Sequence, residues 1–165
     1  MQITHPSALA VYVCIAGCAA AQPAVTVQTT QPVAYQPLVV DLDTESTLSE
    51  TGPVNPFLDR RLDVVFTSPT GATCRVPGFF AGDGTAATST SSTGDIFRVR
   101  FTPDEPGTWA FTTSFRSGAE VAVDLDPLAG SAEPGNGLTG SFTVAPPDPS
   151  APGFLAKGRL RNVGE

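Results

Sequence analysis

The sequence predicts an all-β domain, a sandwich of about seven short antiparallel strands. Gly and Pro number 16 each in 165 residues and charged residues make up only 15%, which favours many turns over long charged helices. Hydrophobic residues are 41% of the chain and include ten Phe, enough for a core that folding can bury. Several segments alternate apolar and polar residues with the period of two that is typical of half-buried strands.

The first part of the domain is expected to hold one strand and then a hairpin. A strand is predicted over residues 37–42, which are rich in Leu and Val. Residues 62–67 alternate apolar and polar side chains. The Pro and Gly of residues 68–71 indicate a turn into a partner strand over residues 72–76. Cys74 in this partner strand is expected to be a small buried hydrophobic residue.

The second part is expected to hold another hairpin and two further strands. Residues 97–101 and 109–115 each place aromatic side chains at alternate positions. The Pro-Asp-Glu-Pro-Gly turn between them indicates that they pair as a hairpin with the aromatic side chains facing the core. Residues 121–125 and 141–144 are predicted to form the remaining strands.

Two stretches are typical of loop insertions. Residues 84–94 consist of Gly, Thr, Ala and Ser, and this low-complexity run is expected to be a mobile, solvated loop. Residues 129–137 have the same character. Strands of this number, separated by Gly and Pro turns over about 105 residues, describe an immunoglobulin-like β-sandwich. The Cys, Trp, Cys spacing of antibody domains is absent, so the likeness is one of architecture.

The predicted sandwich spans residues 37–146 and has an extension on each side. Residues 22–36 are rich in Thr, Gln and Pro, so we expect a disordered tether. Residues 147–165 begin with a Pro-rich run and are expected to be a linker.

Residues 1–21 are predicted to be a signal peptide, because their apolar stretch of about ten residues fits secretion and is too short to span a membrane. Two cleavage patterns stay open. Ala19-Ala20-Ala21 fits ordinary signal cleavage, whereas Ile15-Ala16-Gly17-Cys18 resembles a bacterial lipobox in which Cys18 would receive lipid. No Lys or Arg precedes the apolar stretch, so a misassigned start codon is the other interpretation. We expect an exported protein, extracellular, periplasmic or on the cell surface, with membrane attachment only through a lipid on Cys18.

Charge and residue content exclude several function classes. The net charge of −7 is opposite to what nucleic-acid binding requires. The single histidine, His5, lies in the predicted leader, so a Ser-His-Asp triad or a two-His zinc site is excluded. The acidic residues of the turns at Asp83 and residues 104–105 are expected to cap backbone N–H groups. The spaced pairs Asp41/Asp43 and Asp124/Asp126 offer too few oxygens for Ca²⁺. We therefore predict no catalytic residue, cofactor or metal.

Four segments in order carry a resemblance to a known family. They are Asn55-Pro56-Phe57 leading into residues 62–66, Val-Pro-Gly-Phe-Phe with Gly-Asp-Gly at residues 76–84, Phe-Arg-Val-Arg-Phe with Pro-Gly-Thr-Trp at residues 97–109, and Leu-Thr-Gly-Ser-Phe-Thr-Val at residues 138–144. Together they resemble the N-terminal immunoglobulin-like domain of unknown function found before the apiosidase-like (β/α)₈ barrel in predicted bacterial glycoside hydrolases. The resemblance covers residues 37–146, and only the segment after Gly84 and the acidic residues 120–126 depart from it.

The resemblance implies a non-catalytic accessory domain that positions a glycoside hydrolase barrel in cis and serves carbohydrate metabolism. In relatives, a segment like residues 153–161 leads into that barrel, so we expect this chain to be the N-terminal fragment of a secreted glycoside hydrolase. Phe79 and Phe80 are adjacent on a strand and must face opposite ways, so one is expected in the core and the other exposed, beside Asp83. Phe79, Phe80 and Asp83 are the predicted contact with a ligand or the barrel. The alternative is a free-standing polysaccharide-binding lipoprotein that uses the same aromatic residues.

Overall fold

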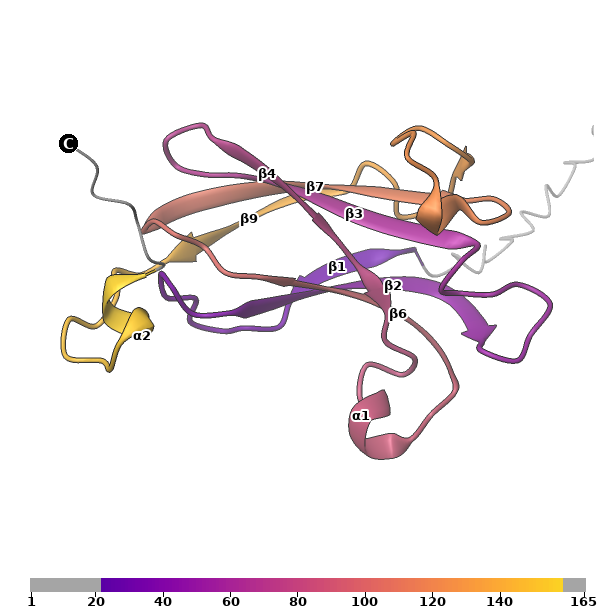
Figure 1. Cartoon of the computed structure of the whole chain (residues 1–165), viewed down its shortest axis with the longest axis horizontal. Coiled ribbons are helices and arrows are strands. Elements are labelled where there is room, and N and C mark those ends of the chain that lie inside the picture. Colours follow the sequence, from indigo (N-terminus) through magenta and orange to yellow (C-terminus); the bar gives the residue numbers. More distant parts are fainter. Residues whose placement is uncertain (1–21, 159–165) are drawn as a thin grey trace, which may run out of the picture.

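The computed structural model describes residues 22–158 and confirms an all-β sandwich of two facing antiparallel sheets (Figure 1). Within the described residues there are nine strands, of which β5 and β8 have only two residues each. The strands are β1 (Ala24–Val27), β2 (Leu38–Ser49), β3 (Arg60–Thr67), β4 (Thr73–Pro77), β5 (Phe79–Phe80), β6 (Thr93–Phe101), β7 (Gly107–Ser117), β8 (Ser131–Ala132) and β9 (Thr139–Val144).

The two sheets have different strand orders. One sheet is ordered β1-β2-β6-β5, and in the other β4-β3-β7-β8 is extended by β9, which also pairs with β7. The predicted hairpin of β3 and β4 is confirmed, with Phe66 opposite Cys74. The segment from β4 to β5 leaves one sheet and enters the other, and therefore ties the two layers together at their edges.

The core lies between the sheets and is built by the alternation that the sequence shows. Alternate residues of β2, β3, β6 and β7 are buried, and Phe66 and Val99 have no exposed surface. The rings of Phe66 and Phe101, one from each sheet, stack with centroids 4.1 Å apart. Burying each such side chain stabilises the fold by about 1.5–3 kcal/mol, so these aromatic residues hold the two layers together.

The predicted hairpin of residues 97–101 and 109–115 is wrong, although both segments are strands. β6 pairs with β2 and β5, whereas β7 pairs with β3, β8 and β9 in the other sheet. The turn at residues 103–107 therefore carries the chain across the sandwich. Aromatic side chains of both strands still face the core, because they meet from opposite layers: Phe101 packs edge-on against Trp109 at 5.1 Å. The alternation of apolar and polar residues is the same whether two strands form a hairpin or lie in opposite sheets, so it could not distinguish the two arrangements.

The segment predicted to be a tether, residues 22–36, is part of the folded domain. Its strand β1 pairs with β2, with Val25 opposite Leu42. Ala34 is fully buried, and Val33 bridges Ala145 beside the last strand. This segment has only two valines in its strand, but β2 presents unpaired backbone N–H and C=O groups along its free edge. Pairing with these groups is enough to add β1 to the sheet.

Two further expectations are wrong for a related reason. Residues 121–125 do not form a strand: Val121–Val123 is a 3₁₀ helix, η1, and Leu125 is 99% exposed. Cys74 is exposed, not buried. It shares a face with buried Phe66, but β4 is an edge strand, and the interior side of an edge strand is covered only where the opposite sheet reaches it.

Two short helices complete the described chain. α1 (Ala86–Ser89) lies in the low-complexity segment and buries no residue, and α2 (Phe154–Lys157) follows the Pro-rich run. In Figure 1, α2 lies at one end of the sandwich and the orange segment around residues 118–135 at the other. No helix in residues 22–158 has the length and apolarity to cross a membrane.

Candidate functional site

The two predicted aromatic residues occupy opposite faces of β5. The side chain of Phe79 is 44% exposed, whereas Phe80 is 5% exposed. Phe80 packs in the core, with its ring 5.4 Å from that of Phe97 and 5.7 Å from that of Phe57. Phe79 is therefore the member of the pair that can contact a partner, and Phe80 fixes the position of the strand that presents it.

Asp83, the third predicted contact residue, holds a turn. Its carboxylate accepts hydrogen bonds from the backbone N–H of Thr85 at 2.8 Å and from the Thr85 hydroxyl at 3.2 Å. Hydrogen bonds from Ser89 and then from Thr85 lower the pKa of Asp83, so the carboxylate is charged near neutral pH. The side chain belongs to the loop before α1, as expected for an acidic turn residue. Cys18, the predicted lipidation site, lies outside the described residues.

Phe79 lies at the rim of a groove of about 340 Å³. We call it the Phe79 groove; its lining includes Phe57, Asp63, Arg75, Phe79, Leu125 and Pro127. The lining residues come from the loop before β3, from β3 to β6, and from η1 and the segment after it. Segments far apart in sequence thus meet at one surface.

A buried carboxylate shared by two arginines lies in this groove. Asp63 Oδ2 accepts a hydrogen bond from Arg75 Nη2 and lies 3.5 Å from Nε of Arg61. The side chains of Arg61 and Asp63 are 9% and 7% exposed, whereas Arg75 is 42% exposed. The hydrogen bond to Asp63 raises the pKa of Arg75, so this guanidinium group stays charged. Two guanidinium groups and one carboxylate leave a net positive charge here, and backbone carbonyl groups of the adjacent segment stabilise it.

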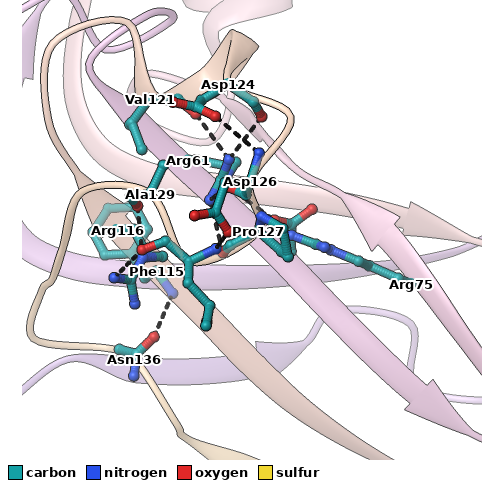
Figure 2. A network of polar contacts seen from close by, with 12 residues as sticks. Arg61, Arg75, Phe115, Arg116, Val121, Asp124, Asp126, Pro127, Ala129 and Asn136 are labelled. Atoms are coloured by element: carbon teal, nitrogen blue, oxygen red, sulfur yellow. Dashed lines mark hydrogen bonds and ion pairs between the residues drawn. The ribbon is translucent and has the colours of Figure 1, made fainter.

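That segment binds Arg61 through its backbone (Figure 2). Nη1 of Arg61 donates to the carbonyl oxygens of Val121 and Asp124 at 3.0 and 3.1 Å. Nη2 donates to those of Asp126 and Pro127 at 3.0 and 2.8 Å. Four carbonyl dipoles therefore point at one buried cation, an arrangement that only the planar fork of arginine can make.

Arg116 fixes the rest of the same segment. Its Nε donates to the carbonyl of Ala129 at 2.7 Å, and its Nη2 donates to those of Leu128 and Gly130 at 2.6 Å each. The side-chain oxygens of Asp124 and Asp126 accept hydrogen bonds from the backbone N–H groups two residues on. Residues 121–130, which we call the arginine-bound loop, thus have their backbone held at many points, although the single turn of η1 is their one regular element.

The arginine-bound loop displays apolar side chains to solvent. Leu125 is 99% exposed, Leu128 70% and Val123 63%. Phe57 and Phe79 on the other side of the groove are 50% and 44% exposed. Large apolar side chains gathered around one groove are typical of an interaction surface, whereas scattered ones need no explanation. Phe57, Phe79 and Leu125 line the groove, whereas Val123 and Leu128 lie on the same loop as Leu125. We call these five residues and the groove the apolar face.

The remaining carboxylates that the sequence singled out do not gather into a site. Asp41 accepts two hydrogen bonds from Arg98, and Glu105 accepts one from Thr70 in a different turn. In the described part of the chain, no three His, Cys, Asp or Glu residues come close enough together to hold a metal ion.

Sequence reasoning missed the most organised part of this site. It found Phe79, but placed residues 121–125 in a strand and gave no role to Arg61, Asp63 or Arg116. One signal was present: Arg61 and Asp63 flank Leu62 in a strand whose outward positions carry opposite charges. Such a pair indicates a covered outer face, but not which distant segment covers it.

Comparison with known proteins gives one family match. The family model of a domain of unknown function, DUF5060, matches residues 32–116. A solved structure of a predicted glycoside hydrolase from Bacteroides vulgatus ATCC 8482 is 24% identical over 72% of this chain, with a TM-score of 0.43. The chitinase ChiW from Paenibacillus sp. str. FPU-7, a cell-surface-expressed multi-modular enzyme, is 13% identical over 75% of the chain, with a TM-score of 0.38. The matches span only 16% and 8% of those two chains. No curated protein matches.

Proposed function

The chain belongs to the DUF5060 family of domains of unknown function, and on that premise we propose that it is a non-catalytic accessory domain that packs against a glycoside hydrolase barrel and positions it. The apolar face is the proposed contact surface. The observation that carries the proposal is the exposure of Phe57, Phe79 and Leu125 around one groove, with Leu125 on a loop whose backbone is already fixed.

The energetics of such a surface favour a protein partner. A flexible loop loses conformational freedom on binding, and this loss opposes association. The arginine-bound loop loses little conformational entropy on binding, because Arg61 and Arg116 already hold seven of its carbonyl groups in place. The free energy gained by burying the exposed aliphatic side chains then contributes almost entirely to the affinity. Aliphatic groups fill apolar pockets of a protein, and they offer no hydrogen bonds to a sugar.

The absence of an active site in this chain is part of the proposal. Glycoside hydrolysis requires two carboxyl groups about 5–10 Å apart across a sugar site. Asp83 binds its own loop, Glu105 binds Thr70, and Asp63 in the Phe79 groove is paired with Arg75 and lies beside Arg61. Purified protein is expected to hydrolyse no glycoside, and turnover of any glycoside panel member would contradict this part.

A binding titration tests the proposed function. The partner is the glycoside hydrolase barrel of a protein whose N-terminal domain belongs to this family, produced without that domain. Isothermal titration of the chain into the barrel is expected to give saturable binding. Leu125→Asp is expected to weaken it by at least about 30-fold, the size of an interface hot spot. Leu125 has almost no contact with its own domain, so this variant keeps the fold.

A matched control adds the same charge elsewhere. Thr143 is exposed on β9, which does not contribute to the apolar face. Thr143→Asp is expected to bind the barrel as the wild type does. Absence of binding by the wild type to any such barrel, or equal weakening by both variants, would contradict the proposal.

Export and truncation remain part of the proposed biology. We propose that the chain is secreted, as a soluble protein or a lipoprotein modified at Cys18, and that it is the front part of a longer enzyme. Sequencing the DNA that follows the last codon tests the second point, and a barrel reading frame is the expected result. Metabolic labelling with palmitate, with Cys18→Ser as control, tests the first.

Polysaccharide binding at Phe79 is the second candidate function. The observation that favours it is an exposed aromatic ring beside the charged pair Asp63–Arg75, because sugars pack on rings and bind charged groups at their edges. A pull-down with insoluble polysaccharides separates the two candidates: retention that is lost in Phe79→Ala but kept in Leu125→Asp supports sugar binding.

A further inference from the structure

A second and larger hollow lies at the α2 end of the sandwich. It has a volume of about 1200 Å³ and is bordered by the turn between β3 and β4, by the turn after β6, and by the segment that contains α2. We call it the Trp109 groove. Its lining shares no residue with that of the Phe79 groove.

The groove exists because the sandwich is open below β4. Cys74 on β4 lies opposite Phe66 and so faces the interior side, yet it is exposed and lines the groove together with Thr73. The core ends here in two aromatic residues, Phe101 and Trp109, which are 8% and 3% exposed and form the floor. A hollow with an aromatic floor and a few polar groups is the usual form of a small-molecule site.

Two further rings stand at the rim. Phe154 in α2 is 63% exposed and reaches the groove. Tyr35 has a φ of 69°, a left-handed conformation that costs a residue with a large side chain about 1 kcal/mol or more. Its N–H is held by the carbonyl of Pro103 at 2.8 Å, and the backbone of Gly158 lies against its ring. The surrounding backbone therefore holds Tyr35 in this strained conformation, and the conformation fixes where its ring lies.

A fixed carboxylate forms the polar wall. Glu105 Oε1 accepts a hydrogen bond from the Thr70 hydroxyl at 2.8 Å, and the Thr70 and Ser68 hydroxyl oxygens lie 3.0 Å apart. Hydrogen bonds from Ser68 and Thr70 lower the pKa of Glu105, so it is charged near neutral pH. The indole N–H of Trp109 donates to the Glu105 carbonyl at 3.0 Å, which fixes the backbone of this residue.

The charge of the lining selects the class of ligand. Among the described residues that line it, Asp104 and Glu105 carry the carboxyl groups, and none is Lys, Arg or His. Phosphate, sulfate or uronate groups would meet negative charge, and the chain as a whole has a net charge of −7. A purely apolar ligand would displace water from the charged Glu105 carboxylate without replacing the hydrogen bonds of that water. A suitable ligand has C–H groups that pack on the aromatic rings and hydroxyl groups that donate hydrogen bonds to Glu105. Such a ligand matches both the apolar and the charged part of the groove.

We propose that the Trp109 groove binds a neutral oligosaccharide, with its C–H faces against Phe154 and Tyr35 and its hydroxyl groups donating to the Glu105 carboxylate. The volume exceeds the roughly 300–1,000 Å³ of common small-molecule sites, which suits a chain of several sugar rings. This inference does not rest on the proposed docking to a barrel, because the two grooves are separate.

Fluorescence provides a direct readout, since Trp109 is the single tryptophan of the chain. The full chain is titrated with cellohexaose, xylohexaose, mannohexaose and laminarihexaose, and with polygalacturonate as an anionic probe. At least one neutral hexasaccharide is expected to shift the Trp109 emission saturably, whereas polygalacturonate leaves it unchanged. Glu105→Gln is expected to weaken that binding about tenfold, because an uncharged amide accepts a weaker hydrogen bond.

The matched control is Glu133→Gln, which alters a carboxylate paired with Arg60 and outside the groove. It is expected to bind like the wild type, and thermal melting of both variants confirms that they are folded. An emission shift with none of the four hexasaccharides overturns the proposal. So does equal affinity of wild type and Glu105→Gln. A shift produced by hexalysine but by no sugar would instead assign the groove to a cationic peptide, and would equally overturn it.

Discussion

The carboxylate of Asp41 accepts two hydrogen bonds from the guanidinium group of Arg98, each at 2.7 Å, across the neighbouring strands β2 and β6. Asp41 is 5% exposed, and Arg98 is the residue that lies opposite it in the register of the two strands. The hydrogen bond to Asp41 raises the pKa of Arg98, so the guanidinium group stays charged. Asp41 therefore has a structural partner, and this bidentate pair is one of the points that fix the register of the sheet.

Asp41→Asn is expected to lower the free energy of unfolding by about 2–4 kcal/mol, because it leaves the mostly buried Arg98 without its counter-charge. Urea denaturation measures the change. Asp43→Asn on the same strand is the control, since the Asp43 carboxylate makes an exposed hydrogen bond to the Glu45 N–H. It is expected to cost below about 1 kcal/mol. Equal losses in the two variants would show that the Asp41–Arg98 pair has no special part in stability.

Arg61→Lys is expected to loosen the arginine-bound loop while the sandwich stays folded. Lysine carries the charge but cannot direct donors to four carbonyl groups. Hydrogen exchange at the amides of residues 121–128 is expected to become at least about tenfold faster than in the wild type, which corresponds to about 1.4 kcal/mol.

Arg100→Lys is the control for this measurement, because Arg100 is exposed on the outer face of β6. Unchanged exchange in Arg61→Lys would mean that the loop is held by its own turns, and that the arginine merely fills space.

Gly140→Ala tests how closely the outer strand packs on the core. A Cβ at this position would lie 2.4 Å from Cζ of Phe111, a ring that is 5% exposed. The collision is expected to lower the free energy of unfolding by about 1–3 kcal/mol. Thr139→Ala, one residue earlier at an exposed position, is expected to cost below about 0.5 kcal/mol. A neutral Gly140→Ala in chemical denaturation would show that β9 can shift without loss.

Stability is expected to fall in acid through carboxylates that hold turns. Backbone hydrogen bonds from Glu120 and then Asn55 lower the pKa of Asp59 below its ordinary 3.8. Because the folded-state value is the lower one, the stabilisation is complete above about pH 4 and is lost as the pH falls through the folded-state pKa. Asp59→Asn is therefore expected to lose less stability than the wild type between pH 5 and pH 2 (from about one unit above the ordinary pKa to about two below it). Identical losses in urea denaturation would contradict this assignment.

The sequence predicted the sandwich well because burial and alternation are local signals. The strands around Leu62, Phe97 and Phe111 alternate so regularly that their inward faces could be named from the sequence. Which sheet each strand joins was not predictable in the same way: Phe101 and Trp109 face each other equally well in a hairpin or across two layers. That choice depends on long-range pairing, which no short pattern encodes.

In the candidate site too, local patterns predicted some residues, and long-range contacts determine the rest. Phe79 and Phe80 follow from the two-residue period of a strand, and the structure places one outside and one inside. Leu125 was expected inside a strand, because Val121, Val123 and Leu125 also alternate. The arginine-bound loop escapes such reasoning, since Arg61 and the carbonyl groups it binds are 60 or more residues apart in the chain.

The most direct test of the central claim, docking through the apolar face, is a hydrogen-exchange footprint. The full chain is compared with and without a saturating glycoside hydrolase barrel from a protein of this family. We predict slower exchange at residues 77–80 and 121–128, and unchanged exchange in β9. A barrel that binds but slows exchange only elsewhere, or that leaves all amides unchanged, would contradict the account.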